Sequence, residues 1–430
     1  MRLTTAKDKQ NIWLMAVIVT LVSVGLLLRD VSGIPINKFI FLVAVAIPIF
    51  TLEVKWFLVF TSLIIPLFVG LPGNYISMCL LARFAYEIFT GEIRCDVLAF
   101  LSAIILGVFL FMQNVIYEKT DVYNMMGAVD FLVLLLLVCG IVQCDAMETA
   151  AVAYLVGVAI TGFIMLTNTL QYYDLQELMD SSTRLGDTGM LHEASSSGMI
   201  VTVDPNFYGM NVIAAVSVAA NLVLFGEPKK KGKGIIIILG IVAIVFSLIG
   251  LSRAFVLVLL GWAILLILGQ GDVKKSLAIQ LVLAVLVIFF LSQFPTVIEG
   301  ILRRFGEGDV TGGNGRINLI IKYYEMWIKN VWTMLFGIGL YNCRTHSTPF
   351  LYLFGIGFVG LIILLLWFVR VIKMTRDRGE NRGLKRWIPF LATFVMWSSI
   401  PAAGAINYTY PVIIAVLALS QKTNGKERTL

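Results

Sequence analysis

The sequence predicts an all-α polytopic membrane protein, a bundle of about 14 transmembrane helices with 12 or 13 as the lower alternatives. Of the 430 residues, 59% are hydrophobic and only 14% are charged, whereas a soluble domain needs more charge to cover its surface. Apolar runs of about 18 residues or more recur along the chain, and each is long enough to cross a hydrocarbon core of about 30 Å. Because lipid offers the backbone no hydrogen-bond partners, these runs must be helices.

The predicted spans follow one another with no internal repeat and no soluble domain, so we expect a single transmembrane domain over residues 1–430. The first span follows a basic segment and lacks a convincing cleavage site, which indicates a retained span rather than a signal peptide. The fourth contains Arg83 and Glu87, which are four residues apart and can pair within one helix. The spans are 11–28, 36–52, 55–71, 74–90, 97–115, 126–143, 147–166, 206–225, 235–251, 254–269, 277–294, 350–372, 387–403 and 408–420.

Lys and Arg in short loops predict the orientation of the bundle. Basic residues gather before the first span, in loops 226–234 and 270–276, between Arg370 and Arg386, and after residue 420. With 14 spans all these segments fall on one side, which places both termini in the cytoplasm. Two long segments, 167–204 and 295–349, then lie on the extracytoplasmic side. Long loops between spans are usually functional, although mere connectors are the alternative.

The second long loop contains an expected amphipathic helix. Apolar residues recur at helical spacing from Ile317 to Ile328, while Lys322, Glu325 and Lys329 occupy the other face. We expect this helix to lie in the membrane surface, with Trp327 and Trp332 near the level of the headgroups. A cap packed on the bundle is the other interpretation, and both can be true.

Arginine is the commoner basic residue on the predicted outer side, whereas lysine is commoner inside. Positive charge outside opposes the orientation rule and therefore suggests another use. The guanidinium group matches phosphate oxygens in a bidentate manner, so an outer set of arginines suits a lipid diphosphate. The set comprises Arg29, Arg184, Arg253, Arg303, Arg304, Arg316 and Arg344.

The two histidines, His192 and His346, both lie in the long outer loops. Histidine titrates near neutral pH and can accept a proton from a hydroxyl. His346 follows Arg344 by two residues and precedes a span, so it should lie at the membrane surface beside positive charge. Of the five cysteines only Cys343 falls outside, and we therefore expect no structural disulfide.

Metal ligands in a recognisable pattern are missing from the sequence of the outer loops, which contain no HExxH, CxxC or Asp-x-Asp. We accordingly expect neither a metal nor another cofactor. The net charge of +7 sits mostly in short loops between spans, so nucleic acid is not an expected partner.

Several motifs then follow one another in a characteristic order between about residues 180 and 370. They are Arg184-Leu185-Gly186, Asp204-Pro205-Asn206, Ser252-Arg253, Gly315-Arg316, Gly337-Ile338-Gly339, Thr345-His346-Ser347 and Gly355-Ile356-Gly357. In this order the chain resembles the bacterial O-antigen ligase and polymerase superfamily, which includes Wzy-type polysaccharide polymerases. The family often has Asn after the late histidine, where this chain has Ser347.

The resemblance implies a metal-independent membrane glycosyltransferase of the GT-C type in the bacterial cytoplasmic membrane. Its donor would be an oligosaccharide on undecaprenyl diphosphate, and a chain-length regulator protein is a further candidate partner. His346 occupies the place of the proposed base, and Arg316 would act with it in catalysis. By the resemblance, Arg184, Arg253 and Arg316 would hold the diphosphate, and the outer set of arginines adds Arg303, Arg304 and Arg344 as further candidates.

Two other functions remain open from the sequence. A ligase that moves a finished glycan to lipid A core or another acceptor would use the same residues. A transporter or flippase of lipid-linked sugars belongs to another class and predicts charged residues inside the membrane and discontinuous helices.

Overall fold

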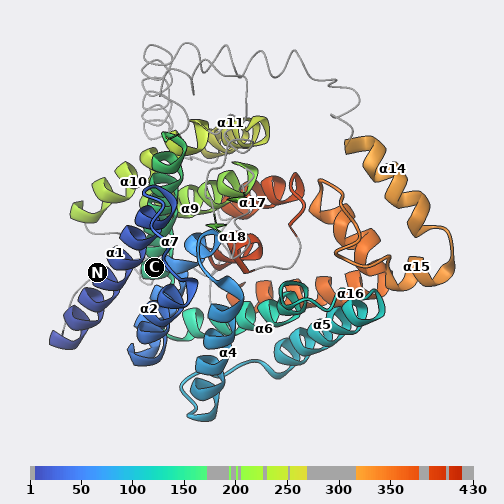
Figure 1. Cartoon of the computed structure of the whole chain (residues 1–430), viewed down its shortest axis with the longest axis horizontal. Helices are drawn as coiled ribbons and strands as arrows, with labels where there is room; N and C mark the ends of the chain where they lie inside the picture. The colour runs from blue at the N-terminus through green and yellow to red at the C-terminus, as the bar shows by residue number, and fades with distance from the viewer. Residues whose placement is uncertain are drawn as a thin grey trace, which may run out of the picture.

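The computed structural model describes residues 5–171, 193–194, 200–201, 205–225, 230–249, 252–268, 316–376, 387–402 and 406–418. These residues are helical (Figure 1), apart from connecting segments and a two-residue antiparallel pair of strands, β1 (Glu193–Ala194) and β2 (Ile200–Val201). The first half contains α1 (Ala6–Asp30), α2 (Lys38–Thr51), α3 (Val54–Ile64), η1 (Ile65–Val69), α4 (Gly73–Phe89), α5 (Val97–Ile116), α6 (Val122–Gln143) and α7 (Met147–Thr169). The second half contains α9 (Pro205–Phe225), α10 (Lys230–Ile249), α11 (Arg253–Leu268), α14 (Arg316–Trp327), α15 (Val331–Phe336), α16 (Thr348–Arg376), α17 (Trp387–Ser398) and α18 (Ile406–Leu417).

Six helices of the described chain are long and apolar enough to cross a membrane, namely α1, α5, α6, α7, α9 and α16. The chain is therefore an α-helical membrane protein. Every predicted span overlaps a helix except 277–294, which lies outside the described residues. At about 1.5 Å per residue, the 12-residue helices α17 and α18 rise only about 18 Å, less than a hydrocarbon core of about 30 Å. The number of complete crossings thus stays a prediction.

Helix α5 shows how these helices meet lipid. Ala99, Ala103 and Leu106 face the bundle and are fully buried, whereas Ile105 and Val108 face outward and are more than half exposed. An outward face this apolar suits hydrocarbon rather than water.

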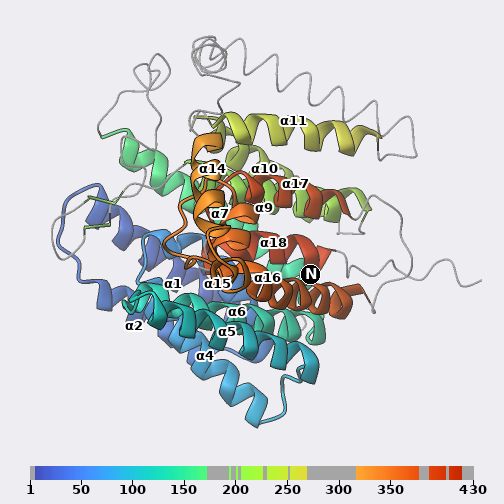
Figure 2. The same ribbon diagram turned by 90° about the vertical axis from the view of Figure 1, so that its right-hand side faces the viewer.

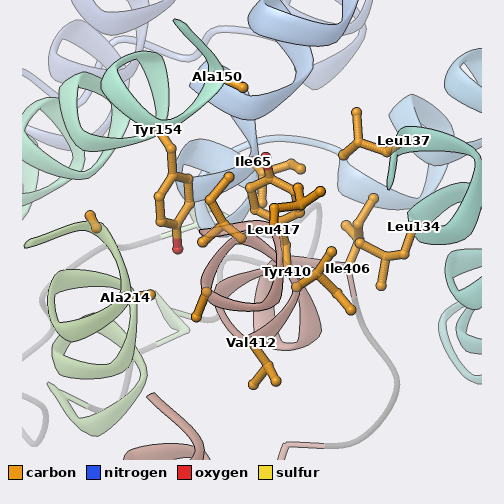
Figure 3. Close-up of a cluster of buried hydrophobic side chains, with 14 of the residues drawn as sticks. Ile65, Leu134, Leu137, Ala150, Tyr154, Ala214, Ile406, Tyr410, Val412 and Leu417 are labelled. Carbon is orange, nitrogen blue, oxygen red and sulfur yellow. The ribbon is translucent and has the colours of Figure 1, made fainter. Parts of the chain in front are cut away.

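Helix α18 forms the centre of the bundle. It packs against α6, α9, α16, α17 and η1, and its residues from Ile406 to Leu417 are buried apart from a partial exposure of Asn407 and Tyr408. Figure 3 shows Tyr410 and Val412 of α18 beside Leu134 of α6, Tyr154 of α7 and Ala214 of α9. Such all-round burial explains why α18 carries no charged residue.

Two pairs of polar side chains hydrogen-bond to each other in this core. The hydroxyls of Tyr410 and Ser62 lie 2.6 Å apart, and the Tyr154 hydroxyl donates to Asn211 Oδ1 at 2.6 Å. Each pair satisfies groups that would otherwise be costly to bury.

The predicted pairing in the fourth span is present. Arg83 Nη2 lies 2.5 Å from Glu87 Oε1 within α4, and Arg83 also donates to the carbonyls of Phe50 and Leu52 at the end of α2. This ion pair therefore closes the end of a neighbouring helix, and its role is structural as expected.

Candidate functional site

The starts of α9 and α11 lie together at one end of the bundle. The Ser252 hydroxyl donates to Asn206 Oδ1 at 2.5 Å and accepts from the Phe255 amide at 3.1 Å, so Ser252 caps α11. Helix α9 begins at Pro205, as its sequence predicts, whereas Asp204 lies outside the described residues. Two motifs that are nearly 50 residues apart in the sequence are thus joined through side chains.

The junction between α17 and α18 connects these helix starts to the start of α16. The ring of Tyr408 in α18 stacks on Phe207 in α9, with centroids 4.2 Å apart. Thr348, the first residue of α16, donates to the carbonyls of Trp397 and Ile400 and accepts from the Ala402 amide at 3.1 Å. Helices α9, α11, α16 and α18 therefore all begin at the same end of the bundle, where their dipoles place partial positive charge.

The segment from Cys343 to Thr348 carries the predicted base. Burial alternates along it: Cys343, Thr345 and Thr348 are buried, whereas Arg344 and His346 are exposed. Arg344 and His346 are therefore two exposed polar residues within three positions, directly before the start of α16.

Close contact between two glycine pairs holds this segment on the bundle. The amides of Ile338 and Gly339 donate to the carbonyls of Phe354 and Gly355 at 2.9 and 3.0 Å. Helix α16 is kinked at Gly357, which has φ +66° and ψ −173°. A Cβ at Gly357 would collide with the backbone nitrogen of Gly337, so both the left-handed φ and the close approach require glycine.

Gln113 of α5 joins the same three stretches of backbone. Its Nε2 donates to Phe336 O at 2.8 Å and to Gly355 O at 2.6 Å, and its Oε1 accepts from the Leu340 amide at 3.3 Å. One turn further, the Tyr117 hydroxyl donates to Gly337 O at 2.6 Å. These bonds satisfy carbonyls that the kink in α16 and the end of α15 leave without helical partners.

Cys343 lies three residues before His346, yet it is not an activated nucleophile. Burial raises the pKa of the Cys343 thiol, and hydrogen bonding to Thr345 offsets this only in part. A reactive cysteine needs a lowered pKa and access to solvent. Of the three, Arg344 and His346 are therefore the exposed candidates at this end.

Asp130 is a residue that the sequence interpretation missed. It is buried within α6, and its Oδ2 accepts from the amide of Ile406, the first residue of α18, at 2.9 Å. Ser77 of α4 also faces the carboxyl, while Oδ1 has no hydrogen-bond partner among the described atoms. A single acid inside an apolar run is the signal that could have identified it.

The predicted amphipathic helix exists as α14, which runs across the neighbouring helices in Figure 2. Trp327 is buried against Phe354 and Phe358, so α14 packs on the bundle, which is the other interpretation of this segment. Trp332 of α15 is 71% exposed, and the position of both rings relative to the headgroups stays a prediction. The outward apolar stripe consists of Ile317, Ile321, Tyr324 and Ile328.

The remaining predicted site residues are described to different extents. Arg253 and Arg316 are the first residues of α11 and α14, but their side chains are not described. Arg184, His192, Arg303 and Arg304 lie outside the described residues. Arg29 is buried, pairs with Asp30 at 2.6 Å and donates to the Gly70 carbonyl, so its guanidinium already has partners within the protein.

Within the described part of the chain, no group of three or more His, Cys, Asp or Glu side chains could hold a metal ion.

The fold and this site together define a class, a polytopic α-helical membrane protein with a cationic end formed by several helix starts. No protein-family model, curated protein or solved structure matches the chain.

Proposed function

We propose that the protein is a polysaccharide polymerase, a membrane glycosyltransferase that joins repeat units carried on undecaprenyl diphosphate. The observation that carries the proposal is the convergence of Arg344, His346 and the starts of α9, α11 and α16 at one end of the bundle. Helix starts and arginines both stabilise anions, and a lipid diphosphate is an anion held at the membrane surface. In the proposed orientation this end faces outward, in a bundle of GT-C type with about 14 crossings.

The proposed reaction balances with the groups present. The oxygen of an acceptor hydroxyl forms a bond to the anomeric carbon of the donor while the bond from that carbon to the diphosphate oxygen breaks. His346 takes the hydroxyl proton, and undecaprenyl diphosphate leaves with its additional negative charge. Arg316 and the other arginines stabilise that charge, each contributing about 10²–10³ in rate, and the base contributes about 10²–10⁴.

The test is a reconstitution of the purified protein in liposomes with lipid-linked repeat units. A ladder of products identifies a polymerase, whereas a single transfer to a separate acceptor identifies a ligase. We expect His346→Ala and Arg316→Ala to remain in the membrane and to form no polymer, while Lys329→Ala, an exposed cation beyond the end of α14, behaves as wild type. Unchanged polymer length and yield in the first two variants would remove the catalytic assignment. EDTA should leave the yield unchanged.

A transporter of lipid-linked sugars is the second candidate, and two observations favour it. Asp130 is buried within α6, and α16 is discontinuous at Gly357, both of which occur in transporters at their binding sites. A transporter would move the lipid-linked unit across the liposome membrane without joining units. Asp130→Asn would stop that movement if the carboxyl binds a coupling ion, but it would leave polymer formation intact in a polymerase.

A further inference from the structure

The connection between Gln113 and the segment of Arg344 and His346 is short and continuous. Gln113 Oε1 holds the Leu340 amide, and the chain then turns at once, because the amides of Asn342 and Cys343 both donate to Gly339 O at 3.0 and 3.2 Å. Arg344 and His346 follow directly. The position of this segment is therefore set on one side by the backbone that Gln113 binds.

Thr348 fixes the other side of the segment by its bonds to the α17–α18 junction. Between these two attachments Cys343 and Thr345 are buried, and the Thr345 hydroxyl donates to the Ser347 carbonyl at 3.1 Å. Loss of the Gln113 side chain would leave the bonds of the Ile338 and Gly339 amides in place but would remove the partners of the Leu340 amide and the Phe336 carbonyl. The turn before Cys343 would then be held less firmly, and His346 would shift.

Gln113 can hold several backbone segments together because its side-chain amide both donates and accepts hydrogen bonds. One side chain binds the end of α15, the turn before Cys343 and the kinked part of α16. The residue is only 4% exposed, so water does not compete for these bonds. An apolar residue of the same size would leave the Phe336 carbonyl and the Leu340 amide unpaired.

We propose that Gln113 is a positioning residue for His346. It fixes the backbone of residues 337–343, through which it influences the position of His346, and it touches no substrate itself. The structural part of this inference is independent of the proposed function, whereas its effect on the polymerisation rate rests on that function.

Chemical modification tests the structural part. The sequence has two histidines, so His192→Gln leaves His346 as the sole target of diethylpyrocarbonate. In that background we expect Gln113→Ala to change the rate of His346 modification several-fold. Gln143→Ala is the matched control and should leave the rate unchanged. Gln143 at the end of α6 accepts a hydrogen bond from the Arg94 amide just before α5, so it too joins two segments, but at the end of α5 remote from Gln113.

Tyr117→Phe is the second variant, and it tests the positioning of His346 if Gln113→Ala does not fold. It removes only the hydrogen bond to Gly337 O and should change the modification rate in the same direction but less. Rates equal to the control in every variant that folds would overturn the proposal.

Kinetics test the second part. Displacement of a reacting group by about 1 Å costs roughly a hundredfold in rate, so we expect Gln113→Ala to lower kcat to about that extent and to leave KM nearly unchanged. An altered modification rate in a protein whose wild type forms no polymer would refute the proposed function and leave the positioning role intact. Normal kcat with normal modification would refute the positioning role alone.

Discussion

Arg344 and His346 are both exposed because the residues beside them face the bundle. Cys343, Thr345 and Thr348 turn inward and are buried, and the two functional candidates are consequently left on the outer face. The buried cysteine and threonines therefore determine the exposure of the site as much as Arg344 and His346 do.

We expect Cys343 to resist alkylation. Burial raises the pKa of its thiol, so the reactive thiolate forms only above the ordinary value of about 8.5. Iodoacetamide at neutral pH should leave Cys343 unlabelled in the folded protein and label it after unfolding, as peptide mass spectrometry would show. Arg344→Cys in a Cys343→Ser background is the exposed control and should react readily. Rapid labelling of Cys343 at neutral pH would contradict its burial.

We expect Asp130→Ala to lower the melting temperature measured in detergent. The carboxylate caps the start of α18 through the Ile406 amide, and loss of a cap of this kind costs about 0.5–2 kcal/mol. Asp130→Asn keeps an oxygen that can accept the same bond, so its loss should be smaller. Equal losses in the two variants would show that the cap is not what Asp130 contributes.

The sequence identified His346 and Arg344 through their residue types and their place before a span, and both lie at the cationic end of the bundle. It could not identify Gln113, because the partners of that amide lie more than 220 residues further along the chain. Asp130 was detectable as an isolated acid, but only the structure shows that it meets the start of another helix.

At the scale of elements, the kink in α16 is the feature that hydropathy does not reveal. The predicted span 350–372 reads as one continuous apolar run, yet the backbone changes direction at Gly357, and the amides of Ile338 and Gly339 bond to the carbonyls just before it. The two Gly-Ile-Gly motifs lie at the kink, but their presence in the sequence alone does not show that their backbones bond to each other.

We expect Gly357→Ala to destabilise the protein. The positive φ alone costs an alanine about 1–2 kcal/mol, and the new Cβ would collide with Gly337 N and Leu335 O. Gly261→Ala is the control: Gly261 lies within α11 with no heavy atom near the position of a Cβ, and alanine there should stabilise the helix by up to about 1 kcal/mol. A melting temperature unchanged by Gly357→Ala would argue against the kink.

Helices α5 and α6 also approach closely at a pair of thiols. Cys95 Sγ and Cys139 Sγ lie 2.7 Å apart and are not bonded, a proximity that the sequence interpretation did not include. In the proposed orientation this pair lies at the cytoplasmic end, where thiols stay reduced.

We therefore expect a Cys95–Cys139 disulfide after treatment of the purified protein with hydrogen peroxide, which takes up the two thiol hydrogens and is reduced to water. The protein isolated from cells with its thiols blocked should lack this disulfide. Non-reducing peptide mapping measures both states, and Cys79→Ser serves as a control that leaves the pairing intact. Quantitative disulfide in freshly isolated protein would place this end outside the cytoplasm.

At the scale of the whole molecule, the helix positions were the most predictable feature because hydropathy is a local property. The predicted ranges match helices wherever the structure describes them, including the short α17 and α18. How those helices pack was not predictable, since the position of α18 at the centre depends on contacts with five other elements.

We expect opposite accessibility at two positions of a cysteine-free variant. A cysteine replacing Arg344 should react with a membrane-impermeant maleimide added to intact cells, whereas one replacing Lys233 near the start of α10 should react only after lysis. The reason is the distribution of basic loops, which places the α10 start in the cytoplasm. The reverse pattern would invert the bundle and remove the proposed outer site.

The burial of α18 has a consequence for how the protein is made. Synthesis proceeds from the N-terminus, so the elements that surround α18, from η1 to α17, leave the ribosome before it does. They must wait in the membrane with their inner faces uncovered until Ile406 to Leu417 arrive. A nonsense mutation just before residue 406 would therefore yield a bundle that lacks its central helix. We expect such a protein to be degraded rather than to behave as a nearly complete protein with a shortened tail.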